Sequence, residues 1–289
     1  VLNGEKIEDL LKSTIARATK ELALPWCLSV FEDNAGIVNF EGGAAIAFKV
    51  ETHNHPSAIE PFGGAATGVG GVIRDILGVW GEPIASTDVL CFGPLDYPYE
   101  KLPKNVKHPR FIYSNVVAGI GNYGNSIGIP TVNGAILFDG SYVGNPLVYC
   151  GTVGIVPKSK YRRSAKAGDI ILLVGGRTGR DGVHGVTFAS EVLHEKSEEV
   201  SRIAVQIGDP ILEEKIKRAI LQVREEELAS GITDLGGGGL SSAVGEQAHR
   251  YSCGARVELD KVPLKYPDMQ PWEIWCSESQ ERMLLLVPK

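Results

Sequence analysis

A cluster of polar side chains that could perform acid–base and phosphate chemistry lies at the end of an apolar run of the sequence. The run Ala44–Thr52 is predicted to be a buried strand, and residues 49–56 read Lys-Val-Glu-Thr-His-Asn-His-Pro. His53 can exchange a proton near neutral pH, Glu51 offers the hard oxygen that Mg²⁺ prefers, and Lys49 offers a point charge for a phosphate. Because a strand end is a rigid place to hold reactive groups, the cluster is favoured as a reactive site over an ordinary polar loop.

A glycine-dense segment at residues 63–71 follows the polar cluster and leads to Arg74 and Asp75. In one interpretation its backbone N–H groups approach an anion, with Arg74 on a phosphate and Asp75 on Mg²⁺. In the other, the glycines allow a helix to pack closely against its neighbours. The pattern is neither a Walker A loop nor a dinucleotide-binding fingerprint, so both interpretations stay open.

Three later segments offer further candidates. The glycine-rich turn at residues 175–182 follows an expected strand and could hold a phosphate or be a surface turn. Asp234 precedes four glycines and an expected helix, so it could bind a metal ion or cap that helix. Residues 278–280, Glu-Ser-Gln, precede the last expected strand and could equally be an ordinary polar turn.

The elements that must position these residues are predicted from the spacing of apolar residues. Helices are expected over the first twenty-odd residues and over 72–77, 184–194, 210–229 and 240–251; strands are expected at 44–52, 89–92, 135–138, 147–156, 169–174, 256–259 and 282–287. A loop is expected around the two prolines at 56 and 61, and a basic, weakly apolar boundary at 157–168. The mixed order indicates α+β architecture in two domains, 1–157 and 158–289.

Composition argues against several classes of protein. The 289 residues carry a net charge of −6, which disfavours nucleic-acid binding. Five cysteines, none at C-x-x-C spacing, disfavour a disulfide scaffold or a zinc site. No apolar run approaches the roughly 20 residues of a membrane span, so a cytoplasmic protein without membrane contact is expected. Both ends resemble boundaries within a longer polypeptide.

The motifs together resemble one family. Residues 48–75, reading FKVETHNHPSAIEPFGGAATGVGGVIRD, are similar to the signature of the synthetase subunit of formylglycinamidine ribonucleotide synthase. Residues 175–190, 205–210, 233–240 and 277–283 match later motifs of that family in the same order, and the resemblance spans roughly residues 25–289. Superfamily relatives such as aminoimidazole ribonucleotide synthetase share the fold without the His-Asn-His segment and the Glu-Ser-Gln motif.

The resemblance implies a reaction of purine biosynthesis. ATP activates the amide oxygen of formylglycinamide ribonucleotide as an iminophosphate, and ammonia derived from glutamine then displaces phosphate to give the amidine. By the same resemblance Lys49 contacts ATP, and His53 is the proton acceptor. The acidic residues Glu51, Asp75 and Asp234 hold Mg²⁺. The substrate site consists of Thr52, His53, Asn54, His55, Arg74, Gln206, Glu278, Ser279 and Gln280.

The resemblance also implies an architecture and partners. The fold expected is that of aminoimidazole ribonucleotide synthetase, with an N-terminal sheet domain that forms half of an intersubunit barrel and a C-terminal α/β sandwich. The expected partners are a glutaminase subunit or domain and a second synthetase half; as a fragment the chain is expected to form a homodimer through its exposed sheet.

Two departures from the family pattern accompany this expectation. No histidine precedes His53, although the family has a second catalytic histidine upstream. Only the first of two synthetase copies is present, so the isolated chain is expected to be inactive. Two rivals remain: another ATP-dependent synthetase of the superfamily, and a fragment that only binds a ligand or a partner.

Overall fold

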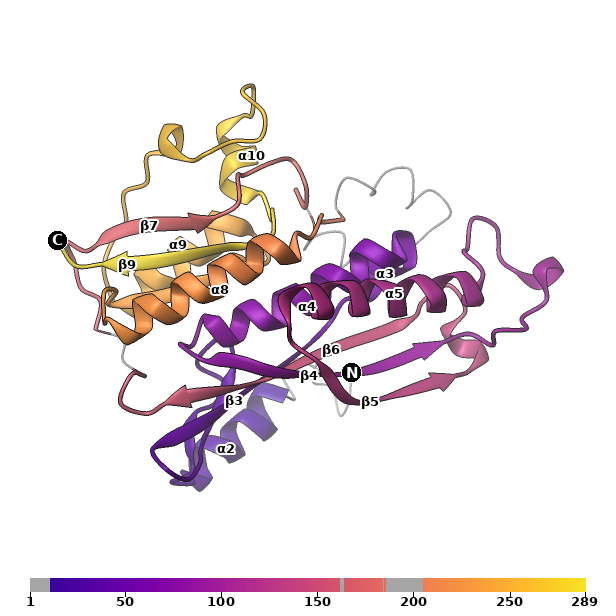
Figure 1. Ribbon diagram of the computed structural model, residues 1–289, viewed down its shortest axis with the longest axis horizontal. Coiled ribbons are helices and arrows are strands. Elements are labelled where there is room, and N and C mark those ends of the chain that lie inside the picture. Colours follow the sequence, from indigo (N-terminus) through magenta and orange to yellow (C-terminus); the bar gives the residue numbers. More distant parts are fainter. Residues whose placement is uncertain (1–10, 162–163, 184, 186–204) are drawn as a thin grey trace.

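The computed structural model describes residues 11–161, 164–183, 185 and 205–289. It contains one sheet of six strands and one of three strands, with helices packed against both (Figure 1). The six-stranded sheet comes from the first half of the chain, and the three-stranded sheet comes from the second half. Mixed sheets and helices of this kind confirm the predicted α+β class.

The first sheet has the strand order β1-β2-β3-β6-β4-β5. Its neighbours are antiparallel except for β4 and β5, which run parallel. The strands are β1 (Cys27–Ser29), β2 (Gly36–Asn39), β3 (Ala44–Thr52), β4 (Glu82–Phe92), β5 (Thr131–Phe138) and β6 (Leu147–Pro157). The associated helical segments are a π-helical segment (Leu11–Ala16), α2 (Arg17–Leu22), α3 (Asn54–Ile59), α4 (Pro61–Leu77), α5 (Pro109–Ile127) and short 3₁₀ turns at Tyr99–Lys101 and Gly140–Tyr142.

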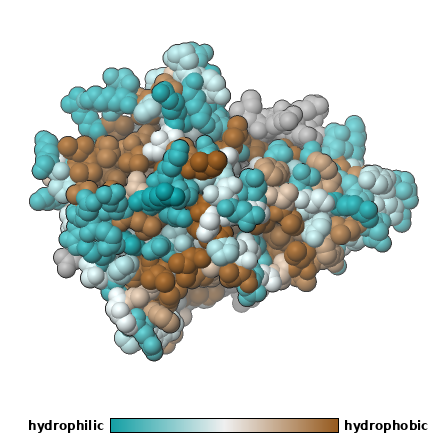
Figure 2. Space-filling view, in the orientation of Figure 1, coloured by the Kyte–Doolittle hydropathy of each residue, from teal (hydrophilic) through white to brown (hydrophobic). Residues whose placement is uncertain are grey.

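One face of the first sheet packs on α4 and α5, and the other face is open. Alternate residues of β4 and β6, such as Leu90 and Val148, are buried under these helices, as the two-residue period of a strand requires. The opposite face exposes large apolar side chains, namely Phe48, Ile84 and Ile155. Figure 2 shows apolar side chains at the molecular surface over this sheet and over β7.

The expectation that β3 is fully buried is therefore wrong. Ala45 and Ala47 are buried, whereas Phe48 on the opposite face is 44% exposed. The run looks continuous in sequence because apolar residues occupy both faces of the strand, and only one of those faces has helices against it.

The glycine-dense segment lies inside α4, which confirms the helix-packing interpretation and contradicts that of an anion-binding loop. Pro61 begins the helix, and the Glu60 carboxylate accepts a hydrogen bond from Gly63 N, a standard way to satisfy a first-turn N–H. A Cβ on Gly64 would lie 2.5 Å from the Pro56 carbonyl carbon, and one on Gly70 would lie 2.5 Å from Tyr123 Oη. The loop expected around the prolines is likewise wrong, because α3 fills it.

The second sheet has the order β7-β9-β8, with β7 (Ile170–Gly175), β8 (Gly231–Asp234) and β9 (Arg282–Val287) all antiparallel. Helix α8 (Pro210–Glu225) covers one face and α9 (Gly239–Arg250) the other. Along β9, Met283 and Leu285 pack toward α8, whereas Leu284 and Leu286 pack toward α9. A 3₁₀ turn (Leu259–Lys261) and α10 (Pro271–Cys276) complete this half. The arrangement is the predicted α/β sandwich.

Several sequence predictions need correction. The expected strand at residues 256–259 is wrong, because that segment is irregular and ends in a 3₁₀ turn. The sequence reading missed α5 altogether, together with β1, β2 and β8. The helix expected at 184–194 falls almost wholly outside the described residues. Among those described, no helix is long and apolar enough to cross a membrane.

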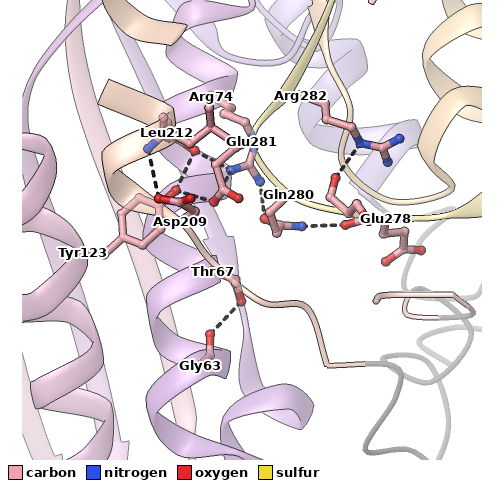
Figure 3. Close-up of polar contacts among 12 residues, drawn as sticks. Gly63, Thr67, Arg74, Tyr123, Asp209, Leu212, Glu278, Gln280, Glu281 and Arg282 are labelled. Carbon is pink, nitrogen blue, oxygen red and sulfur yellow. Dashed lines mark hydrogen bonds and ion pairs between the residues drawn. The ribbon is translucent and has the colours of Figure 1, made fainter. Parts of the chain in front are cut away.

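The two sheets are joined by a buried ion network (Figure 3). Arg74 in α4 is 1% exposed, and its Nη1 lies 2.6 Å from Glu213 Oε2 in α8 and 3.8 Å from Glu281 Oε1 just before β9. Tyr123 Oη in α5 contacts both carboxyl groups. Close by, Leu77 and Trp80 pack against Ile216 and Ile220 of α8. One apolar core and one charged network thus fix the two halves together.

The close approach of α5 to the start of α4 gives a first prediction. A Cβ on Gly119 would lie 2.2 Å from the backbone oxygen of Phe62. We expect Gly119→Ala to lower the free energy of unfolding by about 2–3 kcal/mol, since neither backbone can move without disturbing the core. Urea unfolding monitored by circular dichroism measures this change. Gly121→Ala in the same helix is the control, because its Cβ would meet nothing within 4 Å, and we expect it to stabilise by about 0.5–1 kcal/mol. Equal effects of the two substitutions would refute the packing argument.

The ion network gives a second prediction. Glu213→Ala should lower the free energy of unfolding by about 3 kcal/mol or more, because it leaves the Arg74 guanidinium buried without its nearest carboxyl group. The matched control is the adjacent residue, Glu214, which pairs with the 78% exposed Arg218. Glu214→Ala should change the same free energy by less than about 0.5 kcal/mol. A small effect of Glu213→Ala in the same urea titration would show that the pair does not hold the halves together.

Candidate functional site

An open cavity of about 1490 Å³ lies where the two halves meet. It is lined by the end of β3, by α4, by the end of β8 and by the start of α9. Most of the residues predicted for the site line it: Lys49, Glu51, His53, Arg74, Asp75, Gln206, Asp234 and Gln280. Segments that are far apart in the sequence therefore converge on one space large enough for a nucleotide and a second ligand.

The three carboxyl groups predicted to bind a metal ion face this cavity together with Lys49. Lys49 Nζ lies 3.0 Å from Asp75 Oδ2 and 3.2 Å from Glu51 Oε2. Asp234 Oδ1 accepts a hydrogen bond of 2.6 Å from Asn34 Nδ2. Folding thus brings residues 51, 75 and 234 to one place, as the sequence analysis expected.

The electrostatics of this cluster are those of crowded, partly buried acids. Burial, and then the neighbouring Asp234, raise the pKa of Asp75 well above its ordinary value, and burial raises the pKa of Asp234. Burial by itself would lower the pKa of Lys49, but Asp75 and Glu51 outweigh it and the pKa is raised. Lys49 is therefore firmly charged and neutralises part of the acidic cluster.

The donor set fits a hard divalent cation in its chemistry. Carboxylate oxygens are the ligands that Mg²⁺ takes from proteins, and two of these three carboxyl groups are held in the interior. Among the described residues, however, no group of three or more acidic, histidine or cysteine side chains is close enough together to hold a metal ion. Because the Lys49 ammonium lies between Glu51 and Asp75, metal binding requires this lysine to move aside.

His53 lies immediately before α3 and faces the cavity. Its Nδ1 contacts the carbonyl oxygen of Gly64. Because a carbonyl oxygen only accepts hydrogen bonds, Nδ1 carries the ring proton and Nε2 carries the lone pair. Burial lowers the pKa of His53, so the ring is neutral near pH 7 and Nε2 can accept a proton. Gly68 makes room for this ring, since a Cβ there would lie 2.9 Å from His53 Cβ.

The neighbours of His53 lie outside the residues that line the cavity, as far as the described residues show. Thr52 ends β3 and is paired in register with Tyr149 of β6. Asn54 Oδ1 accepts a hydrogen bond of 2.8 Å from Val148 N, which anchors the segment to β6. Thr52, Asn54 and His55 thus stay predictions as substrate contacts, and for Asn54 the structure shows a role in fixing the loop.

The Glu-Ser-Gln motif is divided between the cavity and the interior. Glu278 accepts hydrogen bonds from Gln206 Nε2 at 2.9 Å and from Gly238 N at 3.1 Å, and is almost fully buried. Ser279 Oγ accepts from Gly179 N at 2.8 Å. Of the motif, Gln280 lines the cavity, and its Oε1 accepts from Arg74 Nη2. The glycine-rich turn at 175–182 is therefore tied to this motif rather than forming a separate site.

Sequence reasoning missed the groups that hold Arg74 and Asp234. Asn34 bonds Asp234, and Tyr123, Glu213 and Glu281 surround Arg74. Asn34, Tyr123 and Glu213 come from segments without a recognisable motif, 90 residues or more away from at least one of their partners. The one available signal was the acidic residue directly after Gln280.

Comparisons with known proteins agree with this geometry. The family model for the N-terminal domain of AIR synthase related proteins matches residues 32–156, and the model for the C-terminal domain matches residues 166–289. Phosphoribosylformylglycinamidine synthase subunit PurL of Thermoplasma volcanium is 49% identical over 269 residues, which cover 92% of this chain and 35% of that protein. The same subunit from Picrophilus torridus is 52% identical over 256 residues, covering 88% of this chain and 34% of that protein.

Solved structures extend the comparison to the fold. Thermotoga maritima PurL complexed with FGAR superposes with a TM-score of 0.79 at 42% identity, covering 93% of this chain and 42% of that one. T. maritima PurL complexed with ATP gives a TM-score of 0.73 at 37% identity and covers 97% of this chain and 46% of that one. PurLQS from the same organism gives 0.72 at 36% identity, with the same coverage of both chains.

The chain spans about a third of the length of the curated relatives that it matches. The two family models lie in the expected order and together cover most of the sequence. The chain belongs to the AIR synthase related family, and within that family it corresponds to part of phosphoribosylformylglycinamidine synthase subunit PurL.

Proposed function

We propose that this chain supplies the ATP- and substrate-binding site of an enzyme that converts formylglycinamide ribonucleotide to formylglycinamidine ribonucleotide in purine biosynthesis. One observation carries the proposal: Lys49, Glu51, His53, Asp75 and Asp234 share one cavity. The similarity to a PurL structure containing FGAR and to another containing ATP supports the choice of ligands.

ATP phosphorylates the amide oxygen in this proposal, and Mg²⁺ accompanies the nucleotide. Glu51, Asp75 and Asp234 would hold the ion, which neutralises phosphate charge when bound. Lys49, released from Asp75, would then contact a phosphate oxygen as a point charge. Phosphoryl transfer needs positioning and charge compensation more than covalent help. The three acidic side chains, which would hold the ion, and the Lys49 ammonium, which would contact the phosphate, are suited to that task.

His53 would act in the second half of the reaction, when ammonia displaces phosphate. Its neutral ring offers Nε2 as the acceptor for the proton that ammonia must lose. Thr52, Asn54 and His55 would lie beside the substrate, and Arg74, Gln206, Glu278, Ser279 and Gln280 would bind it or hold the groups that do. The hydrogen bond of Nδ1 to Gly64 keeps the ring in one tautomer throughout.

The proposal includes partners and a location. A glutaminase subunit or domain would supply ammonia, and PurLQS of T. maritima is a solved structure of a related assembly. A second synthetase half, or a second copy of this chain, would cover the open face of the first sheet and complete a barrel. The domains would divide at about residue 157. The isolated chain would then be inactive, and the enzyme would be cytoplasmic.

The proton-acceptor role predicts the effect of His53→Ala in the longer enzyme. We expect amidine formation to fall by at least 10²-fold, the usual contribution of a general base, with the fold unchanged by circular dichroism. His108→Ala is the control, because that ring packs on Tyr99 in a loop away from the cavity. Near-normal turnover of His53→Ala would remove the role. A wild-type enzyme that consumes the amidine rather than FGAR would instead be an aminoimidazole ribonucleotide synthetase.

The acidic cluster predicts how Mg²⁺ binding depends on pH. The raised pKa of Asp75 means that this carboxyl keeps its proton to a higher pH than an ordinary aspartic acid does, and Mg²⁺ must displace that proton. We expect the calorimetric affinity for Mg²⁺ with ATP to increase as pH rises toward 8. Asp234→Asn should weaken it at least tenfold, whereas Asp260→Asn, at an exposed site, should have no effect. An affinity that is independent of pH, or unaffected by Asp234→Asn, would exclude this metal site.

A further inference from the structure

A second group of ionisable side chains lies behind the cavity, and Arg74 is the member that the proposed function already uses. It consists of Glu213 from α8, Glu281 before β9, Tyr123 from α5 and Arg74 from α4. All four are at least 96% buried as residues. Two further carboxyl groups act on it from outside, Asp209 on Glu281 and Asp234 on Arg74.

The hydrogen-bond geometry of Tyr123 limits how many protons the group can hold. Tyr123 Oη lies 2.6 Å from Glu213 Oε2 and 2.7 Å from Glu281 Oε1. A phenol has one hydrogen to donate, and an ionised carboxylate only accepts. The phenol hydrogen can therefore serve one of these contacts. The other is a hydrogen bond only if that carboxyl group carries a proton and donates it to the phenol oxygen.

The charge balance leads to the same conclusion. Among the described residues, Arg74 is the cation that forms ion pairs with the two carboxyl groups, and the buried Arg282 acts electrostatically on Glu281. With both carboxyl groups ionised, Glu213, Glu281 and Arg74 together would carry a net negative charge in the interior. Two acids that share one site ordinarily keep one proton between them. Burial, partly opposed by Arg74, raises the pKa of Glu213 to about 7, and burial also raises that of Glu281.

The group is rigidly connected to the cavity. A Cβ on Gly70 would lie 2.5 Å from Tyr123 Oη, so the phenol is wedged against α4. Arg74 Nη2 donates to Gln280 Oε1, and Gln280 Nε2 donates in turn to Glu278 O at 2.9 Å (Figure 3). The orientation of the Gln280 amide at the cavity thus depends on where the guanidinium is held.

We propose that Glu213 and Glu281 share one proton through Tyr123, and that this proton-sharing pair positions Arg74 and Gln280 for substrate binding. The second part rests on the proposed function, whereas the first part does not. Glu213, Glu281 and Tyr123 are positioning residues, because they act through Arg74. Loss of the shared proton leaves two repelling carboxylates around one guanidinium and loosens the hold on Gln280.

The shared proton is tested by infrared spectroscopy of the 289-residue chain during a pH titration. Beside any band from the protonated Asp75, wild type should show the carbonyl band of one further buried carboxylic acid, and this band should disappear as pH rises through neutrality. Glu213→Gln and Glu281→Gln should each lack the band, because an uncharged amide replaces the protonated partner. Glu214→Gln, at the adjacent position, should keep it. A band that is missing from wild type, or that survives in both buried variants, would overturn the proposal.

The same variants give a stability test with a defined sign. A carboxyl pKa that is higher in the folded state than in the unfolded state contributes stability below the unfolded pKa, and that contribution is lost as pH rises through the folded pKa. As pH is raised from about 5 to about 8, the urea concentration at the unfolding midpoint should therefore decrease more for wild type than for Glu213→Gln. Parallel pH profiles for the two proteins would also count against the shared proton.

The positioning role is tested with formylglycinamide ribonucleotide as the probe, in calorimetric titrations of the longer protein. Tyr123→Phe should weaken binding about tenfold, the effect of losing one hydrogen bond to a charged group, and should move its pH dependence to lower pH. Glu213→Gln, in which the amide imitates the protonated acid, should bind the probe with near-wild-type affinity, and this affinity should depend less on pH than that of wild type. If wild type binds no probe, the proposed function fails while the infrared result still stands. If Tyr123→Phe binds as wild type does at every pH, the positioning role fails and the function survives.

Discussion

The structure depends on compensating one buried guanidinium. Arg74 is almost completely inaccessible to water, and an unpaired charge in that position would cost several kcal/mol. Its partners come from α8, from the segment before β9 and, through Tyr123, from α5. The charge can be satisfied only when both halves of the chain are folded and docked. The cavity lies where the same two halves meet, so the ion pairs of Arg74 that join the halves also determine the shape of the site.

Small residues in α4 make this arrangement sterically possible. Gly64, Gly68 and Gly70 bring the backbone of α4 against α3, the His53 ring and Tyr123. A side chain at any of these positions would push one component of the site away from the others. The glycines thus shape the cavity indirectly, through helix packing that sets distances, rather than by offering N–H groups to an anion. Their loss would alter the position of His53 and the buried network together.

The sequence was informative where a signal is local and less so where it depends on distant partners. Strands β3 and β9 were predicted to the residue and helix α9 to within one residue, because their apolar periods are clear, whereas α8 was predicted four residues too long. The convergence of Glu51, Asp75 and Asp234 was also predicted, although from a family resemblance rather than from spacing. Helix α5 was missed because glycines and asparagines dilute its apolar stripe, and tertiary packing against α4 overrides their low helix propensity. The carboxyl partners of Arg74, Glu213 and Glu281, lie 139 and more residues away, so no local pattern could pair them with it.

The acidic cluster and the buried network both contain more carboxyl groups than neighbouring cations, and they balance this negative charge in different ways. In the cavity, the carboxyl groups of Glu51, Asp75 and Asp234 outnumber the Lys49 ammonium that lies between Glu51 and Asp75. Protons can remove part of that excess, which is why burial and mutual repulsion raise the pKa of Asp75, and a divalent cation can remove all of it. Behind the cavity the side chains are buried, and in our proposal a shared proton balances Glu213 and Glu281 against Arg74. Solvent access thus distinguishes a cavity that a metal ion could enter from a buried network whose charge changes when a proton is gained or lost.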